Sequence, residues 1–388
     1  MNKYKSMIYV IFITILMTFS MRSVNNMVVT TLPLLANKVL YFSSLLVGVI
    51  SASVYLFTFI VTSMVNPRLN SKQRRASFIA ANFAVVMVLI MYYYANDISV
   101  WIASAIAGLA YGIIMPNMIN AASLLADQRS RERLLGVYSV GLSLSLIIGP
   151  SLEDYFLKFI GYRSVFIYFL PIAIIGLIVS MLMNFPEIKN ENHKTAIRSK
   201  GLKAGILTIT TYNVPFAAIT VFLTIFAISH FHISRSLAYS SYIYFFGVSF
   251  MTRLYMSIKP FKNVRTPLII SILITISALL LFPVVPSFVF FIAIMMALGI
   301  PHGSIFPIST IIISRGTSPE ERSAANSYFM AFNNILFMLI PVFFGFIERY
   351  IGYSMTFMVL IIPVVLSAFL LFKEYGNNSI MVAKPKAM

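Results

Sequence analysis

The sequence contains no cysteine, which excludes disulfide bonds, cysteine nucleophiles and cysteine-ligated metal sites. Charge is also scarce, because Asp, Glu, Lys and Arg make up only 10% of the 388 residues. A water-soluble domain carries about 25% charged residues and roughly 45 to 50% apolar ones. With 59% hydrophobic residues, this chain has more apolar surface than a soluble fold can bury. We therefore expect that lipid surrounds it.

Motifs for binding metal, nucleotide or nucleic acid are missing as well. His230 and His232 alternate in one predicted loop without an acidic neighbour, so we predict no metal site. No glycine-rich phosphate loop is present, and we expect neither a cofactor nor enzymatic activity. The net charge of +18 would indicate a nucleic-acid partner in a soluble protein. Here the basic residues lie in short loops between apolar blocks, which is typical of a membrane topology signal, so no nucleic-acid partner is expected.

What the sequence has in abundance is apolar blocks of about 20 residues, the length that a helix needs to cross a bilayer. The loops between the blocks are too short to hold a separate soluble domain. The sequence therefore predicts an all-α integral membrane protein with twelve transmembrane helices. Their expected positions are 7–33, 41–65, 76–95, 98–125, 134–157, 163–185, 203–229, 235–258, 266–284, 287–313, 324–347 and 354–372.

The distribution of Lys and Arg predicts the orientation of these helices. Most basic residues lie in alternate loops and in the two tails, and cytoplasmic loops carry an excess of Lys and Arg. We expect a multi-pass protein of the plasma membrane with both termini in the cytoplasm. The longest polar stretch is predicted to be a cytoplasmic linker, 187–202, between an N-terminal six-helix bundle, 1–186, and a C-terminal one, 203–388.

An internal repeat supports this division into halves. A shift of 191 residues places Gly, Pro and Arg residues of the first half on identical residues of the second. Because these residue types set backbone shape and loop charge, ungapped agreement at one offset indicates a duplicated six-helix unit. The matched pairs include Gly108 and Gly299, Gly112 and Gly303, Pro116 and Pro307, Arg131 and Arg322, Pro150 and Pro341, and Gly161 and Gly352.

The segment from the fourth to the sixth predicted helix resembles the major facilitator superfamily. It contains in order Gly108, Gly112 and Pro116, then Asp127, Glu132 and Arg133, then Gly149 and Pro150, then Gly161, Tyr162, Arg163 and Phe166. The resemblance covers essentially the whole chain. It implies two pseudo-symmetric six-helix bundles and a substrate site between them that opens alternately to either side.

Two positions depart from the family's pattern. Leu69 occupies the position of the Asp that usually precedes the basic residues in the loop between helices 2 and 3. The usual cytoplasmic charge latch is therefore in doubt. In the fifth helix, Glu153 and Asp154 stand where family antiporters often carry two glycines.

Polar side chains inside predicted membrane helices are the candidates for a substrate site, because their burial in lipid is costly. Arg22 lies near the middle of the first helix, at helical spacing with Asn25 and Asn26. It contacts either an anionic or polar substrate or a structural partner, and amides are as often interhelical contacts as ligands. The predicted substrate-binding residues are Arg22, Asn25, Asn26, Tyr111, Asn117, Tyr212, Asn213, His302 and Asn333.

Few titratable groups lie at membrane depth, and three of them are candidates for proton coupling: Glu153, Asp154 and His302. The two carboxylates are either solvated at the outer helix end or partly buried and able to exchange protons. His302 is either a proton relay or a hydrogen-bonded packing residue.

These residues favour a monomeric secondary transporter of a small molecule, with proton-coupled export as the first hypothesis. The alternatives are uptake or facilitated diffusion of a metabolite or organic anion, or a lipid flippase. A non-transporting membrane sensor is a further alternative, disfavoured because no soluble signalling domain accompanies the helices. The expected partners are the substrate, protons and the lipid bilayer.

Overall fold

The computed structural model describes residues 7–42, 44–123, 127–157, 159–185, 193–233, 235–258 and 261–382. In this part of the chain the regular structure is helical, apart from one isolated bridge between Asn263 and Val382. The chain divides into two compact units. Unit 1 comprises Met1–Thr195 with Pro319–Ala331, and unit 2 comprises Ala196–Ser318 with Phe332–Met388.

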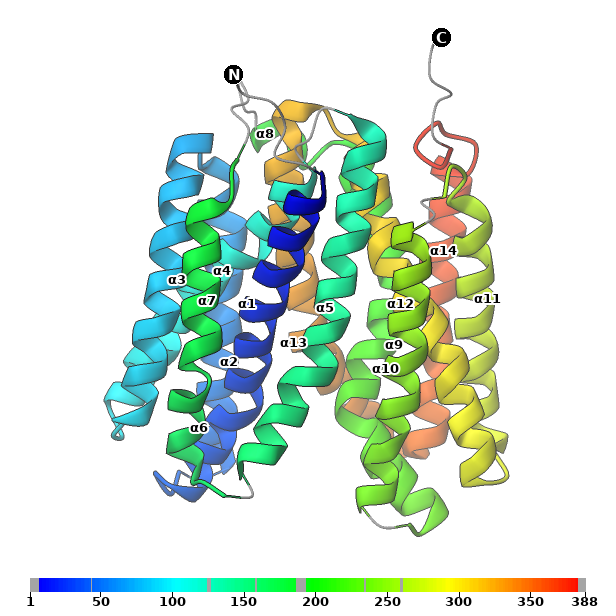
Figure 1. Cartoon of the computed structure of the whole chain (residues 1–388). Coiled ribbons are helices and arrows are strands. Elements are labelled where there is room, and N and C mark those ends of the chain that lie inside the picture. The colour runs from blue at the N-terminus through cyan, green and yellow to red at the C-terminus, as the bar shows by residue number, and fades with distance from the viewer. Residues whose placement is uncertain are drawn as a thin grey trace. The chain divides into compact units, whose positions relative to one another are not determined.

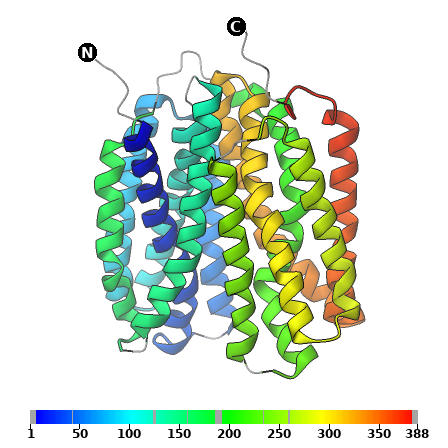
Figure 2. The same cartoon turned by 45° about the vertical axis from the view of Figure 1, so that its right-hand side comes forward.

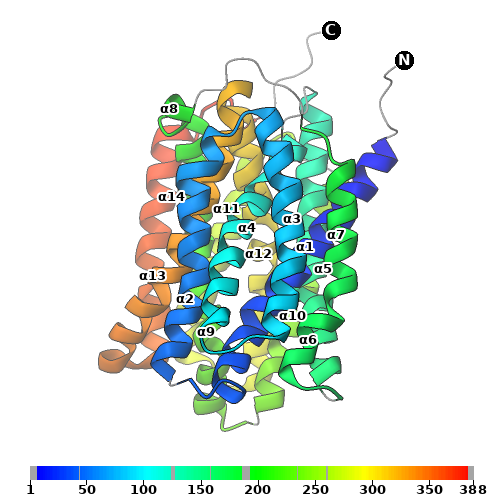
Figure 3. The ribbon, with the colours of Figure 1, turned by 90° about the vertical axis from the view of Figure 1, so that its left-hand side faces the viewer.

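Unit 1 is built mainly from the helices of the first half of the chain (Figure 1). Within it α1 packs against α5, and α4 packs against both α2 and α3, as Figure 3 shows from the side of α2 and α3. Its helices are α1 (Met7–Lys38), α2 (Ser44–Ile60), η1 (Val61–Val65), η2 (Asn66–Arg68), α3 (Ser71–Tyr93), α4 (Ser99–Ser123), α5 (Gln128–Leu157), α6 (Tyr162–Tyr168) and α7 (Leu170–Leu182).

Unit 2 follows the short helix α8 (His193–Ala196) and is coloured from green to red in Figure 2. In it α12 packs against α9, α10 and α11, and α14 packs against α9. Its helices are α9 (Lys200–Phe231), α10 (Arg235–Ile258), α11 (Arg265–Leu281), η3 (Phe282–Val284), α12 (Phe288–Gly316), α13 (Pro319–Val359) and α14 (Ile361–Tyr375). The first turns of α13, Pro319–Ala331, belong to unit 1.

The described residues hold the twelve predicted membrane passes. Ten stretches are long and apolar enough to cross a membrane by length and composition alone. One of these, Pro319–Tyr375, covers two passes, because Gly352 breaks the helical backbone inside α13 with a φ of 75°. The remaining pass is α10, whose composition is more polar. The prediction of an all-α membrane fold is confirmed.

Many helix ends differ from the predicted ones by several residues, as in α1, which ends at Lys38 rather than at residue 33. The sixth pass is divided into α6 and α7 at Phe169, two residues before Pro171, which has no amide proton for the helical ladder. The eleventh and twelfth passes meet at Gly352, inside the predicted gap 348–353, although α13 runs on to Val359. The predicted linker 187–202 lies partly outside the described residues, and the division into 1–186 and 203–388 stays a prediction.

The same kind of close helix contact occurs once within each unit. A Cβ atom on Gly108 of α4 would lie 2.5 Å from the carbonyl oxygen of Val54 in α2. A Cβ atom on Gly299 of α12 would lie 2.6 Å from the carbonyl oxygen of Phe245 in α10. Phe245 follows Val54 by the same 191 residues that separate the two glycines. The repeat found in the sequence is therefore also a repeat of backbone contacts.

Candidate functional site

The first group of candidate residues lies where α1 contacts α5 in unit 1. Polar residues at positions 22, 26 and 30 share one face of α1, because they are four residues apart. Arg22 is half-buried, and its Nη2 donates a 2.8 Å hydrogen bond to the hydroxyl of Tyr138 in α5. Its buried Nε has no hydrogen-bond partner in the described part of the chain. Tyr138 was missed by sequence reasoning, since nothing local marks it.

Asn26 and Asn25 lie one turn further along α1 and are both half-buried. The Nδ2 atom of Asn26 donates to the backbone carbonyl of Ser145 at 3.3 Å. The structure thus brings Arg22, Asn25 and Asn26 into one partly accessible strip of unit 1, as the helical spacing predicted.

Glu153 lies at the next contact between α1 and α5 and is 5% exposed. Thr30 Oγ1 lies 2.5 Å from its Oε2 atom, and Thr31 Oγ1 lies 2.7 Å from its Oε1 atom. The sequence left open whether this carboxyl group is solvated or buried, and the structure buries it beside the buried Thr31, while Thr30 is exposed. The side chain of Asp154, the neighbouring candidate, lies outside what the structure describes.

The two candidates on α4 are both buried in unit 1. Tyr111 is 1% exposed, and its hydroxyl has no hydrogen-bond partner among the described residues. Asn117 is fully buried, and its Nδ2 atom donates to Asn66 Oδ1 at 2.6 Å and to the carbonyl of Ile113 at 2.8 Å. Asn117 therefore belongs to a network of side chains, and in this structure it faces no open space.

That network joins α4 to η2 and to the first turns of α13, all within unit 1. Of its members the sequence singled out only Asn117, and Asn66 lies just beyond the predicted helix 41–65. The members, defined here as the amide network, are Asn66, Asn117, Asn120, Ser123, Ser323, Asn326 and Ser327.

The second group of candidates lies in unit 2. Asn213 of α9 donates a hydrogen bond from its Nδ2 atom to Asn333 Oδ1 of α13, and both residues are buried. Tyr212, 1% exposed, donates to the carbonyl of Leu298 at 3.4 Å. The two predicted amides therefore bond to each other.

His302 of α12 lies among aromatic rings of unit 2. Its ring centroid is 4.3 Å from that of Phe216 and 4.9 Å from that of Phe245. Its Nδ1 lies 2.7 Å from Ser249 Oγ, and Arg253 Nη2 donates to the His302 carbonyl at 3.0 Å. This geometry fits the packing interpretation of His302. Arg253, 2% exposed, was missed, although a cation inside an apolar block was a usable signal.

A hollow of about 620 Å³ lies along one face of α9 in unit 2. Two threonines, a serine and a tyrosine contribute hydroxyl groups to it, and the rest of the lining is aliphatic. The residues are Thr220, Val221, Thr224, Ile225, Ile228, Ser229 and Tyr242. A groove lined in this way suits the surface of an uncharged or amphiphilic molecule.

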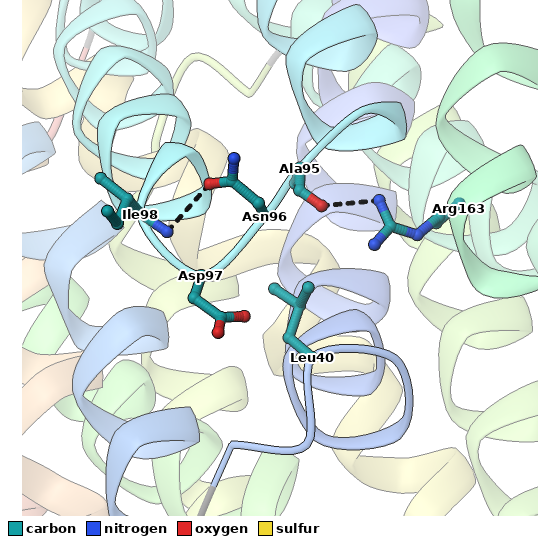
Figure 4. A pocket seen from close by; sticks show the side chains of 6 residues that line it. All are labelled: Leu40, Ala95, Asn96, Asp97, Ile98 and Arg163. Carbon is teal, nitrogen blue, oxygen red and sulfur yellow. Dashed lines mark hydrogen bonds between the residues drawn. The ribbon is translucent and has the colours of Figure 1, made fainter.

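A second hollow, of about 430 Å³, lies at the loop between α3 and α4 (Figure 4). Arg163 borders it and donates from Nη1 to the carbonyls of Tyr93 at 3.0 Å and Ala95 at 2.6 Å. Asp97, exposed on the other side, completes the polar lining. Because Arg163 is engaged with the end of α3, we assign it a structural role in holding this loop.

The arrangement of twelve passes, a duplicated half and polar groups within helices is matched by known proteins. A family model described as Major Facilitator Superfamily matches residues 12–260 and 255–380. The chain belongs to the major facilitator superfamily. No curated relative matches the sequence.

Solved structures of this superfamily share the fold at low sequence identity. The human organic anion transporter MFSD10 is 12% identical, with a TM-score of 0.79 over 95% of this chain and 100% of that one. The E. coli fucose:proton symporter FucP is 15% identical, with a TM-score of 0.75 over 95% and 99% of the two chains. The proton:xylose symporter XylE is 14% identical, with a TM-score of 0.75 over 95% of each chain. The protein is thus a multi-pass membrane protein of a transporter superfamily.

Proposed function

We propose that this superfamily member exports a small organic molecule by alternating access and that protons entering on Glu153 drive the export. The observation that carries the proposal is the buried carboxyl group between α1 and α5, held by the hydroxyls of Thr30 and Thr31. An ionisable side chain within a membrane protein is costly to bury and by default marks a substrate or proton path.

The groups around Glu153 suit both of its protonation states. When the carboxylate is charged, Thr30 and Thr31 each donate a hydrogen bond to one of its oxygens. When it is protonated, its O–H donates to the Thr30 oxygen, and the Thr30 hydroxyl turns to the carbonyl of Asn26, 2.9 Å away. Protonation therefore moves a hydrogen bond on α1 and leaves no buried polar group unsatisfied.

The sequence and the similar folds favour different directions of transport. The Gly149-Pro150 pair resembles that of antiporters in this superfamily, which favours exchange of an outgoing substrate for an incoming proton. FucP and XylE are named as proton symporters, which supports proton coupling but favours the opposite direction. The experiment must therefore impose the pH gradient in both directions.

The test is transport by purified protein in liposomes against a panel of radiolabelled compounds. We expect Glu153→Gln to abolish accumulation driven by a pH gradient and to preserve exchange of the substrate at equal pH, because glutamine keeps the size of the side chain and cannot carry the proton. Asp154→Asn and His302→Gln are assayed beside it as the other candidates. Glu348→Gln is the matched control, since it removes a carboxylate from a half-buried position and should retain both activities.

If the Glu153→Gln protein responds to the pH gradient as the parent does, Glu153 is not the proton carrier. Loss of coupling in the Asp154 or His302 variant alone would transfer the role to that residue. If none of the three variants alters coupling, facilitated diffusion becomes the better description of the protein.

Arg22 favours a second candidate function, the uptake of an organic anion. Its guanidinium is half-buried, has a buried Nε without a hydrogen-bond partner in the described chain, and lies on the accessible strip of α1. MFSD10, a similar fold, is named as an organic anion transporter. This function predicts that Arg22→Gln weakens transport of carboxylates far more than transport of neutral compounds of the same size.

We further propose an oligomeric state and a membrane orientation for the protein. The protein works as a monomer in the plasma membrane, with both termini and the segment 187–202 in the cytoplasm. The positive-inside distribution of Lys and Arg supports this orientation.

A further inference from the structure

The hollow at the loop between α3 and α4 lies at one end of unit 1, where several segments of the chain meet (Figure 4). Leu40 follows the end of α1, residues 95–98 form the loop, and Arg163 lies in the first turn of α6. Its volume of about 430 Å³ falls in the range of small-molecule sites, about 300 to 1,000 Å³. The hollow is therefore large enough to receive a polar group of several non-hydrogen atoms.

One cationic and one anionic side chain line this hollow, and they do not pair with each other. Arg163 uses a single nitrogen, Nη1, for its bonds to the carbonyls of Tyr93 and Ala95. Within the described part of the chain, its Nη2 and Nε atoms have no hydrogen-bond partner, and neither has the carboxylate of Asp97. In the view of Figure 4, Leu40 separates the two charged groups. Both charges are thus open to a ligand that carries both signs.

The two groups bind different chemistry. The Nε–H and Nη2–H of a guanidinium form a parallel pair of donors, which matches two oxygens of one phosphate. A carboxylate has only acceptors, so it binds a group with N–H donors such as a primary ammonium. A ligand that satisfies Arg163 and Asp97 together carries a phosphate and a primary ammonium in one headgroup.

The side chains that flank the hollow along the sequence indicate a position at the membrane surface. Tyr41, Tyr94 and Ile98 are 86%, 73% and 75% exposed, and Phe42 stacks on Trp101 with ring centroids 6.1 Å apart. Tyrosine and tryptophan are enriched at the level of the lipid headgroups, where the ring contacts lipid and the polar atom contacts water. Because the loop joins the ends of two membrane passes, it lies at that level.

An apolar stripe leads from the hollow along α3. Phe83, Met87 and Tyr94 lie on one face of the helix, because they are four and seven residues apart. They are 54%, 40% and 73% exposed, which is expected for side chains that contact acyl chains. A molecule with its headgroup in the hollow therefore has an apolar surface for its tails.

We propose that the hollow binds a zwitterionic phospholipid with a primary ammonium, such as phosphatidylethanolamine. The phosphate accepts from Nε and Nη2 of Arg163, the ammonium donates to the carboxylate of Asp97, and the acyl chains lie along α3. In the proposed orientation this lipid belongs to the outer leaflet. The site goes beyond the proposed transport function, because it shares no residue with the candidate substrate and proton groups.

The test compares the binding of three phospholipids with identical acyl chains to the purified protein in detergent. Native mass spectrometry measures the fraction of protein that carries dioleoyl phosphatidylethanolamine, phosphatidylcholine or phosphatidylglycerol at each lipid concentration. Phosphatidylcholine has no N–H on its ammonium, and phosphatidylglycerol has no positive charge. We expect phosphatidylethanolamine to bind about fivefold more tightly than either, a ratio at the upper end for exposed ion pairs.

Asp97 provides the variants, because it is exposed and bonds to no other described residue, so its replacement should leave the fold intact. Asp97→Asn should lower the preference for phosphatidylethanolamine over phosphatidylglycerol to about twofold or less. Asp97→Lys should reverse that preference, because two cations then attract the anionic headgroup. Glu348→Gln is the matched control, since it removes a carboxylate from unit 2, which contributes no residue to the hollow.

A soluble competitor separates a lipid from a free zwitterion. Glycerophosphoethanolamine carries the same headgroup without acyl chains, and we expect it to leave the bound lipid in place at equal concentration. Displacement of the lipid would assign the hollow to a soluble zwitterion and overturn the proposal of a lipid site.

Three other results would also overturn the proposal. The first is equal binding of phosphatidylethanolamine and either of the other lipids by the parent. The second is a preference that survives both Asp97 variants, and the third is a preference that Glu348→Gln removes as well. The assay requires neither transport nor a pH gradient, so its outcome is independent of whether Glu153 carries the proton.

Discussion

Replacing Gly299 by alanine tests the helix packing on which the fold of unit 2 depends. The added methyl group would lie 2.6 Å from the carbonyl oxygen of Phe245 and 2.8 Å from Cβ of Val248. Neither atom is the free end of a flexible side chain, so relief requires α12 to move away from α10. Overpacking of this kind costs about 1 to 3 kcal/mol.

Gly247 offers a control in the same unit with the opposite expectation. No atom lies within 4 Å of the position where its Cβ would be built. Gly247→Ala therefore adds a methyl group without a clash and removes the helix penalty of glycine, about 1 kcal/mol. Because both glycines lie inside helices, this gain is common to both substitutions, which should differ by the overpacking cost alone, about 1 to 3 kcal/mol.

The assay is the fraction of detergent-solubilised protein that stays monodisperse after heating. We expect Gly299→Ala to melt below the parent and Gly247→Ala to melt at or above it. By the repeat, Gly108→Ala should resemble Gly299→Ala, since its Cβ would lie 2.5 Å from the Val54 carbonyl. Equal melting of the Gly299 and Gly247 variants would show that α10 and α12 are not in the close contact described here.

Two further predictions concern the loops. Arg163→Gln should cost about 1.5 to 3 kcal/mol of stability, because a charged donor to the carbonyls of Tyr93 and Ala95 is lost; the same heating assay measures it, with the exposed Arg349→Gln as control. Lys194→Cys should react with an impermeant maleimide only after cells are permeabilised, and labelling of intact cells would reverse the proposed orientation.

Most of the fold could be predicted from the sequence because the bilayer imposes a length and a hydropathy on each pass. The repeat added the pairing of Gly108 with Gly299, which the structure reproduces down to the backbone atoms that each would meet. Boundaries were harder to predict. Gly352 ends a pass through its positive φ, whereas Gly161, its partner in the repeat, begins α6 with a φ of −75°. Two glycines at equivalent positions of the repeat thus adopt different backbone conformations.

The candidate site was predictable only in part. The sequence shows which charged or polar side chains would be costly to bury, but it does not show which residues form hydrogen bonds to them. Arg22 and Glu153 were identified by their charge. Their partners are ordinary residues, and Tyr138 lies 116 positions after Arg22. Asn117 was predicted as a substrate contact from its helix alone, and only the tertiary structure shows that Asn66 and Asn120 occupy its hydrogen-bonding groups.

Arg22 and Glu153 both lie where α1 packs against α5, and this shared position would couple substrate binding to proton binding. Thr30, which bonds to Glu153, lies two turns along α1 from Arg22, with Asn26 between them on the same face. In the proposed cycle, protonation of Glu153 would turn the Thr30 hydroxyl toward the Asn26 carbonyl, so the proton and a substrate bound to Arg22 would act on the same stretch of α1. Linkage is reciprocal: whatever factor the proton imposes on substrate affinity, the substrate imposes on proton affinity. A compound that binds this strip must therefore bind with a pH dependence that Glu153→Gln removes, whereas a compound that binds only the hollow of α9 must not.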